Sequence, residues 1–335
     1  MKKIKIAQIG TSLNGHGQRI FDSLKKQTDI FEIAGVAFPE NEKEKFPQLM
    51  GMFDGYRELT VEEILNDPEI EAVIIETEEI YLTKYSILAA QHNKNIHMEK
   101  PGGTDLAEFE KLISLVKRNN LVFHIGYMYR YNSFVIELLK QVKNGDLGEI
   151  ISVEAQMNCS QPLVFREWLK SLKGGMMFYL GCHLIDIILQ IQGAPEKIIP
   201  LNKATMFETD SEDFGMAVFE YKNGISFAKA VAIERGGFAR RQLVVTGTKK
   251  TVELKPFEMH CNPQTPNVLY TNKIEYNEEG WYEYGTESKS EVYDRYDTMM
   301  KTFSQMVTGE RENKNTPDYE LMLYKTILTS CGIDR

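Results

Sequence analysis

The chain has 335 residues, of which 42% are hydrophobic and 26% are charged, a composition typical of a globular protein with room for two domains. Its net charge of −9 argues against a nucleic-acid partner, because phosphate binding needs clustered positive charge. No apolar run reaches membrane-spanning length. The cysteines Cys159, Cys182, Cys261 and Cys331 are too widely spaced for a zinc site or a CxxC motif. We therefore expect a cytoplasmic protein with reduced thiols, no metal site, and neither nucleic acid nor membrane as a partner.

The first part of the chain alternates strand and helix patterns. Strands are expected at residues 4–10, 31–38, 71–77, 93–99 and 121–127, and helices at 18–26, 83–91 and 106–119. Short apolar strands that alternate with helices indicate a parallel sheet covered on both faces. The sequence thus predicts an α/β Rossmann dinucleotide-binding domain over residues 1–125.

A different pattern begins after about residue 150. A strand is expected at residues 149–157, followed by hairpins at 211–233 and 241–255, the first with Asn223-Gly224 as its turn. Helices are expected at residues 179–193, 296–309 and 318–331. We expect an α+β domain over residues 126–335 with a large, mostly antiparallel sheet for substrate binding and oligomerisation, and we expect its C-terminal helices to pack back on the first domain.

A glycine-rich turn follows the first strand. The dinucleotide fingerprint is GxGxxG, and here Gly10, Thr11, Ser12 and Gly15 stand at its start, with Ser12 in place of the middle glycine. A serine can still donate a hydrogen bond to phosphate, and a helix N-terminus favours an anion. An ordinary strand-to-helix turn is the alternative, but the position after the first strand favours a nucleotide site.

The end of the second strand does not decide between NAD and NADP. This strand normally ends in an acid that binds the adenosine ribose, but here it ends at Phe38-Pro39, and Glu40 follows. Glu40 could reach the ribose or could be a solvated loop residue. No arginine stands at this point to indicate a 2′-phosphate.

The stretch "EKPGG" follows the fourth strand. Lys100 is expected at the edge where parallel sheets bind ligands, and Pro101 restricts the backbone of Lys100 and ends the strand. An ammonium group there can bind a substrate oxygen and stabilise charge that develops on it, while Glu99 can balance that charge or contact the cofactor. A surface Glu-Lys pair in a loop is the alternative.

Four segments in order resemble the Gfo/Idh/MocA oxidoreductases, named for glucose-fructose oxidoreductase and inositol dehydrogenase. They are "EKPGG", "GYMYRYNSFVIELLKQVKNGDLGEIISVEAQ", "GGMMFYLGCHLIDIILQIQG" and the final helices. The resemblance covers essentially the whole chain. It implies that Lys100 contacts substrate and nicotinamide, that His183 is the general base, and that the protein forms a homodimer or homotetramer.

The residues around His183 agree with this role. Leu180, Leu184, Ile187, Ile188 and Ile191 form an apolar stripe, whereas His183, Asp186 and Gln190 form a separate polar one. A histidine off the core face is free to point into a cleft. The alternative is a partly buried histidine bonded to Asp186.

The sequence departs from the family pattern at three places. Tyr179 stands where many members carry an aspartate, Ser12 replaces a glycine, and the TPxxxH run is reduced to its threonine, Thr77, which we expect to contact the cofactor. The neighbouring Glu76, Glu78 and Glu79 add negative charge close to the expected dinucleotide.

Further substrate contacts are expected from residues that suit polyhydroxylated rings by stacking and hydrogen bonding. They are Tyr127, Arg130, Tyr131, Arg166, Trp168 and Tyr179. Arg235, Arg240 and Arg241 could line the same cleft or lie on a solvated sheet face, and we favour the solvated face.

Three functions follow from these observations. The first is an NAD(P)-dependent dehydrogenase that acts on a secondary alcohol of a sugar, amino sugar or cyclitol. The second is a dinucleotide- or sugar-binding sensor or regulatory protein, suggested by the departures. The third is a hydrolase or lyase that uses a tightly held NAD transiently.

Overall fold

The computed structural model describes residues 3–206, 210–261 and 268–333. The chain forms two compact units, and each is assembled from two stretches of sequence. The first comprises Met1–Tyr127 and Tyr296–Tyr324, and the second comprises Met128–Arg295 and Lys325–Arg335.

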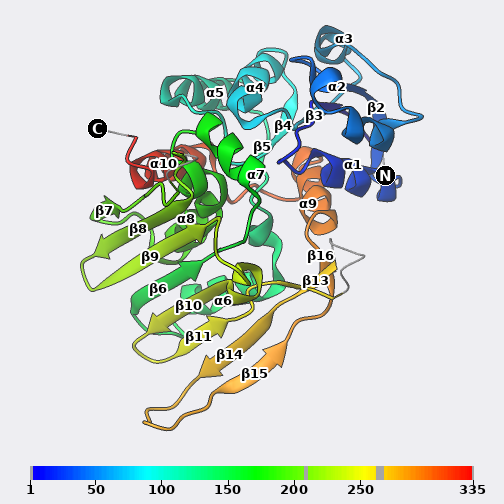
Figure 1. The fold of residues 1–335 in the computed structure, drawn as a ribbon. Helices are drawn as coiled ribbons and strands as arrows, with labels where there is room; N and C mark the ends of the chain where they lie inside the picture. The colour runs from blue at the N-terminus through cyan, green and yellow to red at the C-terminus, as the bar shows by residue number, and fades with distance from the viewer. Residues whose placement is uncertain (1–2, 207–209, 262–267, 334–335) are drawn as a thin grey trace. The chain divides into compact units, whose positions relative to one another are not determined.

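The first unit is built on a parallel sheet of five strands in the order β2-β1-β3-β4-β5 (Figure 1). The strands are β1 (Ile4–Ile9), β2 (Phe31–Ala37), β3 (Ala72–Ile75), β4 (Asn95–Met98) and β5 (Phe123–Ile125). Every neighbouring pair is parallel. The predicted Rossmann architecture is confirmed.

Helices cover both faces of this sheet. They are α1 (Gly17–Lys26), α2 (Glu42–Lys45), α3 (Val61–Asn66), α4 (Leu82–Gln91), α5 (Leu106–Arg118) and α9 (Asp297–Val307), with 3₁₀ turns at Pro47–Phe53 and Glu79–Tyr81. Phe109 of α5 lies 6.3 Å from Phe123, whereas Phe303 of α9 lies 5.5 Å from His124. Because successive strand residues point to opposite faces, α5 and α9 cover opposite faces of the sheet.

The second unit is built on a sheet of eight strands in the order β15-β14-β11-β10-β6-β9-β8-β7 (Figure 1). The strands are β6 (Ile150–Gln156), β7 (Lys197–Pro200), β8 (Phe214–Tyr221), β9 (Gly224–Val231), β10 (Gln242–Gly247), β11 (Thr251–Leu254), β14 (Asn272–Tyr276) and β15 (Thr286–Lys289). All pairs are antiparallel except β6 with β9. The predicted large, mostly antiparallel sheet is confirmed. The sequence did not predict a small sheet of β12 (Met259–His260), β13 (Val268–Tyr270) and β16 (Tyr293–Asp294).

The turn of the β8–β9 hairpin differs from the prediction by one residue. Tyr221 pairs with Gly224, so Lys222 and Asn223 form the loop and Gly224 already belongs to β9. A Cβ on Gly224 would lie 1.8 Å from the carbonyl oxygen of Ile151. The glycine is therefore required by the close approach of the neighbouring strand and not by the turn.

The helices of the second unit include the predicted one around His183. They are α6 (Ser133–Asn144), α7 (Leu163–Trp168) and α8 (Cys182–Gln192), with short turns at Met128–Tyr131, Leu169–Ser171 and Gly237–Arg240 and a π-helical turn at Met177–Gly181. The final helix, α10 (Pro317–Ser330), contributes residues to both units. Within the described ranges, no helix has the length and apolar character needed to cross a bilayer.

Candidate active site

The glycine-rich turn connects β1 to α1 with a backbone that fits an anion. Gly10 has φ +88°, and a Cβ there would lie 2.4 Å from the side chain of Thr77, so only glycine fits. The Gly15 N–H donates to Ser12 Oγ at 2.9 Å, which means that Ser12 holds the turn in place of the missing glycine. The hydroxyl of Thr11 is buried and has no hydrogen-bond partner among the described residues. The turn thus offers a polar cradle before the N-terminus of a ten-residue helix, and it fits a dinucleotide phosphate.

An acid that bonds to this turn is Glu42, which the sequence analysis missed. The Thr11 N–H donates to Glu42 Oε2 at 3.1 Å, and Glu42 is fully buried. Burial raises the pKa of Glu42 to about 9, so its carboxyl group is neutral near pH 7. Glu40 and Asn41 both have a φ of 58°, and no sequence spacing indicates this left-handed turn into α2.

Glu40 lies in the loop after β2 but has partners of its own. Lys84 Nζ donates to its Oε1 at 2.5 Å, and the Tyr85 hydroxyl donates to the same oxygen at 2.7 Å. The bond from Lys84, followed by that from Tyr85, lowers the pKa of Glu40. Its predicted contact with a ribose stays a prediction.

Two of the three acids after β3 lie in environments that favour the neutral form over the negative charge that the sequence suggested. Glu76 is fully buried, and burial followed by the charge of Glu99 raises its pKa well above the ordinary value. Burial also raises the pKa of Glu79 to about 7. Both environments favour the neutral acid. The carboxylate of Glu78, in contrast, lies 2.6 Å from the ammonium group of Lys45, which is exposed.

Glu99 and Lys100 follow β4 and are both about 1% exposed. Lys100 Nζ lies 3.5 Å from Glu99 Oε1, and the same oxygen lies 3.0 Å from Nδ1 of His16 in the glycine-rich turn. The peptide bond between Lys100 and Pro101 is cis. The buried ion pair excludes the alternative of a surface Glu-Lys pair, and its link to His16 is a contact that the sequence did not indicate.

A buried pair of histidines lies in the same unit. His97 Nδ1 and His124 Nδ1 are 2.7 Å apart on adjacent strands, and His97 Nε2 lies 3.7 Å from Glu76 Oε1. Burial lowers the pKa of His97 to about 4. Glu76, His97 and His124 thus form a buried polar group at neighbouring strands of the sheet.

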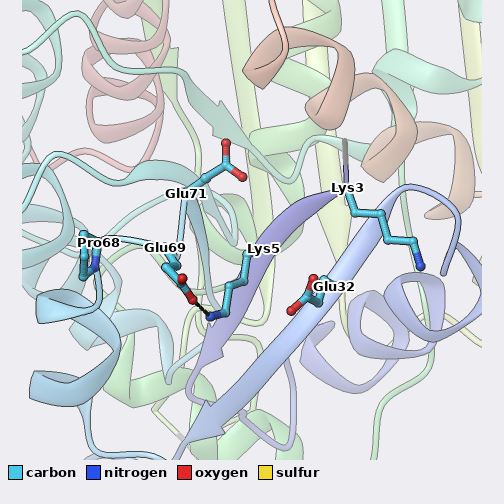
Figure 2. A pocket seen from close by; sticks show the side chains of 6 residues that line it. All are labelled: Lys3, Lys5, Glu32, Pro68, Glu69 and Glu71. Atoms are coloured by element: carbon cyan, nitrogen blue, oxygen red, sulfur yellow. Dashed lines mark hydrogen bonds and ion pairs between the residues drawn. The ribbon is translucent and has the colours of Figure 1, made fainter. Parts of the chain in front are cut away.

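A cavity of about 630 Å³ lies at the opposite end of this sheet, near the start of β1 (Figure 2). Its lining residues are Lys3, Lys5, Glu32, Pro68, Glu69 and Glu71. Lys5 Nζ lies 2.5 Å from Glu69 Oε2, so this rim is a set of surface charges. Parallel sheets bind ligands at the carboxyl ends of their strands, and we assign no role to this cavity.

In the second unit, His183 is only 2% exposed and Asp186 is 1% exposed. The interpretation of α8 as a helix with a polar stripe off the core was therefore wrong, because α8 is buried on nearly all sides. The ring of Tyr129 contacts the imidazole of His183 at 5.0 Å in an edge-to-face arrangement. Asp186 receives Arg130 Nε at 2.9 Å and Nη2 at 2.8 Å, and the alternative of a bond between Asp186 and His183 stays a prediction.

Tyr129 connects His183 to a buried polar cluster. Its hydroxyl donates to Glu258 Oε1 at 2.5 Å, and Glu258 also receives Arg241 at 3.0 Å and Arg295. Arg241 is 7% exposed, so the expectation of a solvated sheet face was wrong for it. Nothing in the sequence spacing indicated Tyr129 or Glu258, which lie 129 residues apart.

The remaining basic and aromatic candidates divide into two groups. Arg235 and Arg240 are exposed, as favoured. Trp168 and Tyr179 meet edge to face at 5.3 Å, and Arg166 Nη1 lies 3.7 Å from the buried carboxylate of Asp213.

Two further residues, Tyr127 and Tyr131, were predicted to contact the substrate. Tyr127 is fully buried and Tyr131 is partly exposed. Lys100 belongs to the first unit and His183 to the second, so their convergence on one cofactor stays a prediction.

Comparison with known families gives two matches. Residues 4–127 match the family described as "Oxidoreductase family, NAD-binding Rossmann fold". Residues 135–253 match the family described as "GFO/IDH/MocA C-terminal domain".

Individual relatives are more distant. The chain is 30% identical over 139 residues to the uncharacterised oxidoreductase YhhX of Escherichia coli, covering 41% of this chain and 40% of that protein. It is 25% identical over 226 residues to scyllo-inositol 2-dehydrogenase (NADP(+)) of Bacillus subtilis, covering 65% of this chain and 60% of that protein. The chain therefore spans less than two thirds of the length of these relatives.

A solved structure extends the likeness to the whole fold. UDP-N-acetylglucosamine 3-dehydrogenase from Acidithiobacillus ferrooxidans superposes with a TM-score of 0.75 at 18% identity, covering 99% of this chain and 98% of that one.

Proposed function

We propose that the protein is an NAD(P)-dependent dehydrogenase acting on a secondary alcohol. The chain belongs to the Gfo/Idh/MocA family of oxidoreductases, and this membership is the starting point of the proposal. The substrate class that we propose is a sugar, amino sugar or cyclitol. The observation that carries the proposal is the buried Lys100–Glu99 pair at the carboxyl end of β4. The names of two similar proteins, an inositol dehydrogenase and an amino-sugar dehydrogenase, support the substrate class.

In this proposal Lys100 orients the substrate hydroxyl and stabilises negative charge on its oxygen. Glu99, at 3.5 Å, keeps the ammonium in place. Bound nicotinamide supplies a hydride acceptor or donor. The hydroxyl proton goes to His183, which suits general base work as a neutral imidazole.

The surroundings of His183 support a fixed orientation for this base. Tyr129 packs against its ring, and burial raises the pKa of Tyr129, so its hydroxyl stays protonated and bonded to Glu258. A base that is held by packing keeps the geometry that proton transfer requires.

We assign the other candidates as follows. Gly10, Thr11, Ser12, Gly15, Glu40, Thr77 and Glu99 hold the cofactor, and Tyr127, Arg166, Trp168 and Tyr179 contact the substrate. Arg130 is bidentate to Asp186, so we now assign it the role of fixing α8 beside His183.

A polyol and sugar panel tests the proposal. Wild-type protein is mixed with NAD⁺ or NADP⁺ and each compound, and the appearance of reduced nicotinamide is followed by absorbance. Lys100→Ala and His183→Ala should each abolish turnover with an unchanged circular dichroism spectrum. Unchanged turnover in either variant would remove that residue from the mechanism.

A second candidate is a sensor that binds dinucleotide or sugar without turnover. Tyr179 favours it, because tyrosine cannot supply the carboxylate charge that many family members have at this position. Tight NAD(P)H binding with no redox change across the panel would support the sensor. A product formed without net cofactor reduction would instead indicate transient use of NAD.

We also propose a homodimer or homotetramer in the cytoplasm. One row across the large sheet holds five half-buried apolar residues with Glu154 and Glu253 between them: Ile199, Val218, Phe227, Val244 and Ile274. A second copy would cover this row. Light scattering at micromolar concentration tests the proposal, and a monomer would contradict it. The free thiols of all four cysteines support a reducing compartment.

A further inference from the structure

His16 occupies an unusual position in the first unit. It lies between Gly15 and Gly17, at the residue that precedes α1, and its side chain makes no capping bond to that helix. Its Nδ1 is instead 3.0 Å from Glu99 Oε1, and its ring packs against Tyr296 at 5.7 Å. The side chain is 20% exposed. His16 and Glu99 are 83 residues apart in the sequence, and the contact between them fixes the imidazole on the glycine-rich turn.

The carboxylate that holds His16 is charged. Burial alone would raise the pKa of Glu99, but the charges of His16 and Lys100 outweigh it and lower that pKa. An imidazolium next to a carboxylate is stabilised by it. A charged carboxylate therefore lies against Nδ1 of a ring that belongs to the turn.

A cation at the turn would add to the backbone N–H groups and the helix N-terminus in binding a pyrophosphate. Residues 10–17 contain no lysine or arginine. The nearby cations have carboxylate partners: Lys45 with Glu78, and Lys84 with Glu40. The buried Thr11 hydroxyl, which has no hydrogen-bond partner in the described part of the chain, lies at the same turn, 3.3 Å from the position of a Cβ on Gly17. This hydroxyl is an independent sign of a polar ligand there.

We propose that His16 binds the pyrophosphate of the dinucleotide as an imidazolium, with Glu99 as its fixed counter-charge. The proposal rests on the cofactor use proposed above and adds a residue to it. It also links the two ends of the site, because the carboxylate that orients Lys100 is the one that holds His16.

Fluorescence titration with NADH and NADPH tests this role without any substrate. Wild type is compared with His16→Gln, which is neutral, and with His16→Arg, which restores a cation. His92→Gln is the matched control, because His92 is exposed at the end of α4 and bonds to the carbonyl of Leu88. Each protein is also titrated with ADP-ribose and with adenosine as competitors, of which only ADP-ribose carries a pyrophosphate.

We expect His16→Gln to weaken NAD(P)H and ADP-ribose by about tenfold or more, the loss of one charge-assisted hydrogen bond. Adenosine should compete equally with both proteins, His16→Arg should bind NAD(P)H within about threefold of wild type, and His92→Gln should behave as wild type. Equal weakening of adenosine, unchanged binding by His16→Gln, or an arginine variant as weak as the glutamine variant would each overturn the proposal. Absence of binding by wild type would refute the proposed cofactor use itself.

Discussion

Replacing Glu42 with glutamine is expected to stabilise the protein, and by more at neutral than at acidic pH. Burial raises the pKa of Glu42 to about 9 in the folded chain, whereas an unfolded glutamate ionises near its ordinary value. Between these two values the folded state binds one proton more than the unfolded state. The free energy of unfolding therefore falls as pH rises through this window and levels off above the folded pKa. Glutamine cannot ionise, so the variant does not lose this part of its unfolding free energy as pH rises.

The size of the effect follows from the same difference. At about 1.4 kcal/mol per pH unit, the loss amounts to about 4 kcal/mol near pH 7.5 and less than about 1 kcal/mol near pH 5. The advantage of Glu42→Gln should therefore grow by about 3 kcal/mol between these conditions. Any cost of placing an amide beside Thr11 is independent of pH and cancels in the comparison.

Urea unfolding followed by circular dichroism measures this difference. Tryptophan fluorescence would not serve, because Trp168 and Trp281 both belong to the second unit. Glu62→Gln, at an exposed position of α3, is the control and should show no pH-dependent gain. If the gain of Glu42→Gln were the same at both pH values, the assignment of a neutral buried carboxyl group would be wrong.

Three further predictions concern other parts of the two units. Asp186→Asn leaves the buried guanidinium of Arg130 without its carboxylate and should cost about 3–5 kcal/mol, measured by urea unfolding with tryptophan fluorescence; a loss below about 1 kcal/mol would contradict the pairing. Gly10→Ala forces a side chain into positive φ and against Thr77, and it should destabilise the fold by about 2 kcal/mol or more and abolish NADH binding; wild-type binding would show that the turn can move. Because burial raises the pKa of Glu79 to about 7, this group becomes negative as pH rises, and NADH affinity should fall by up to about tenfold between about pH 6 and pH 8. The fall should be smaller in Glu79→Gln, and an equal fall in both proteins would exclude this residue as its cause.

The sequence predicted the elements whose signal is local. Apolar strands that end in glycine or charged residues placed the parallel sheet, and Gly10 marked the turn at its first strand. The hairpins of the second unit were also readable from alternation, although Gly224 was assigned to the turn because an Asn-Gly pair usually forms one. The structure shows that a glycine is required here because the backbone of the neighbouring strand β6 approaches too closely for a side chain.

The sequence could not predict features that depend on burial or on distant pairing. The apolar and polar stripes of α8 suggested one exposed face, but His183 and Asp186 of that helix are buried, and distant Arg130 provides the partner of Asp186. The bond between His16 and Glu99 joins residues from different strand ends, and no local pattern encodes it. Likewise, whether an acid such as Glu76 is charged depends on its burial and its neighbours. The sequence shows only that acids follow the third strand, and it therefore suggested a negative charge at Glu76 where burial favours the neutral form.

The division of the chain also has a consequence for biosynthesis. The first unit is completed by residues 296–324, which the ribosome makes after nearly all of the second unit. Until then, His97 and His124 lack the cover that Phe303 provides in the finished fold. The nascent sheet therefore lacks this part of its cover while most of the polypeptide is synthesised. An N-terminal fragment that ends at Tyr127 should consequently be a client of chaperones and not an independent domain.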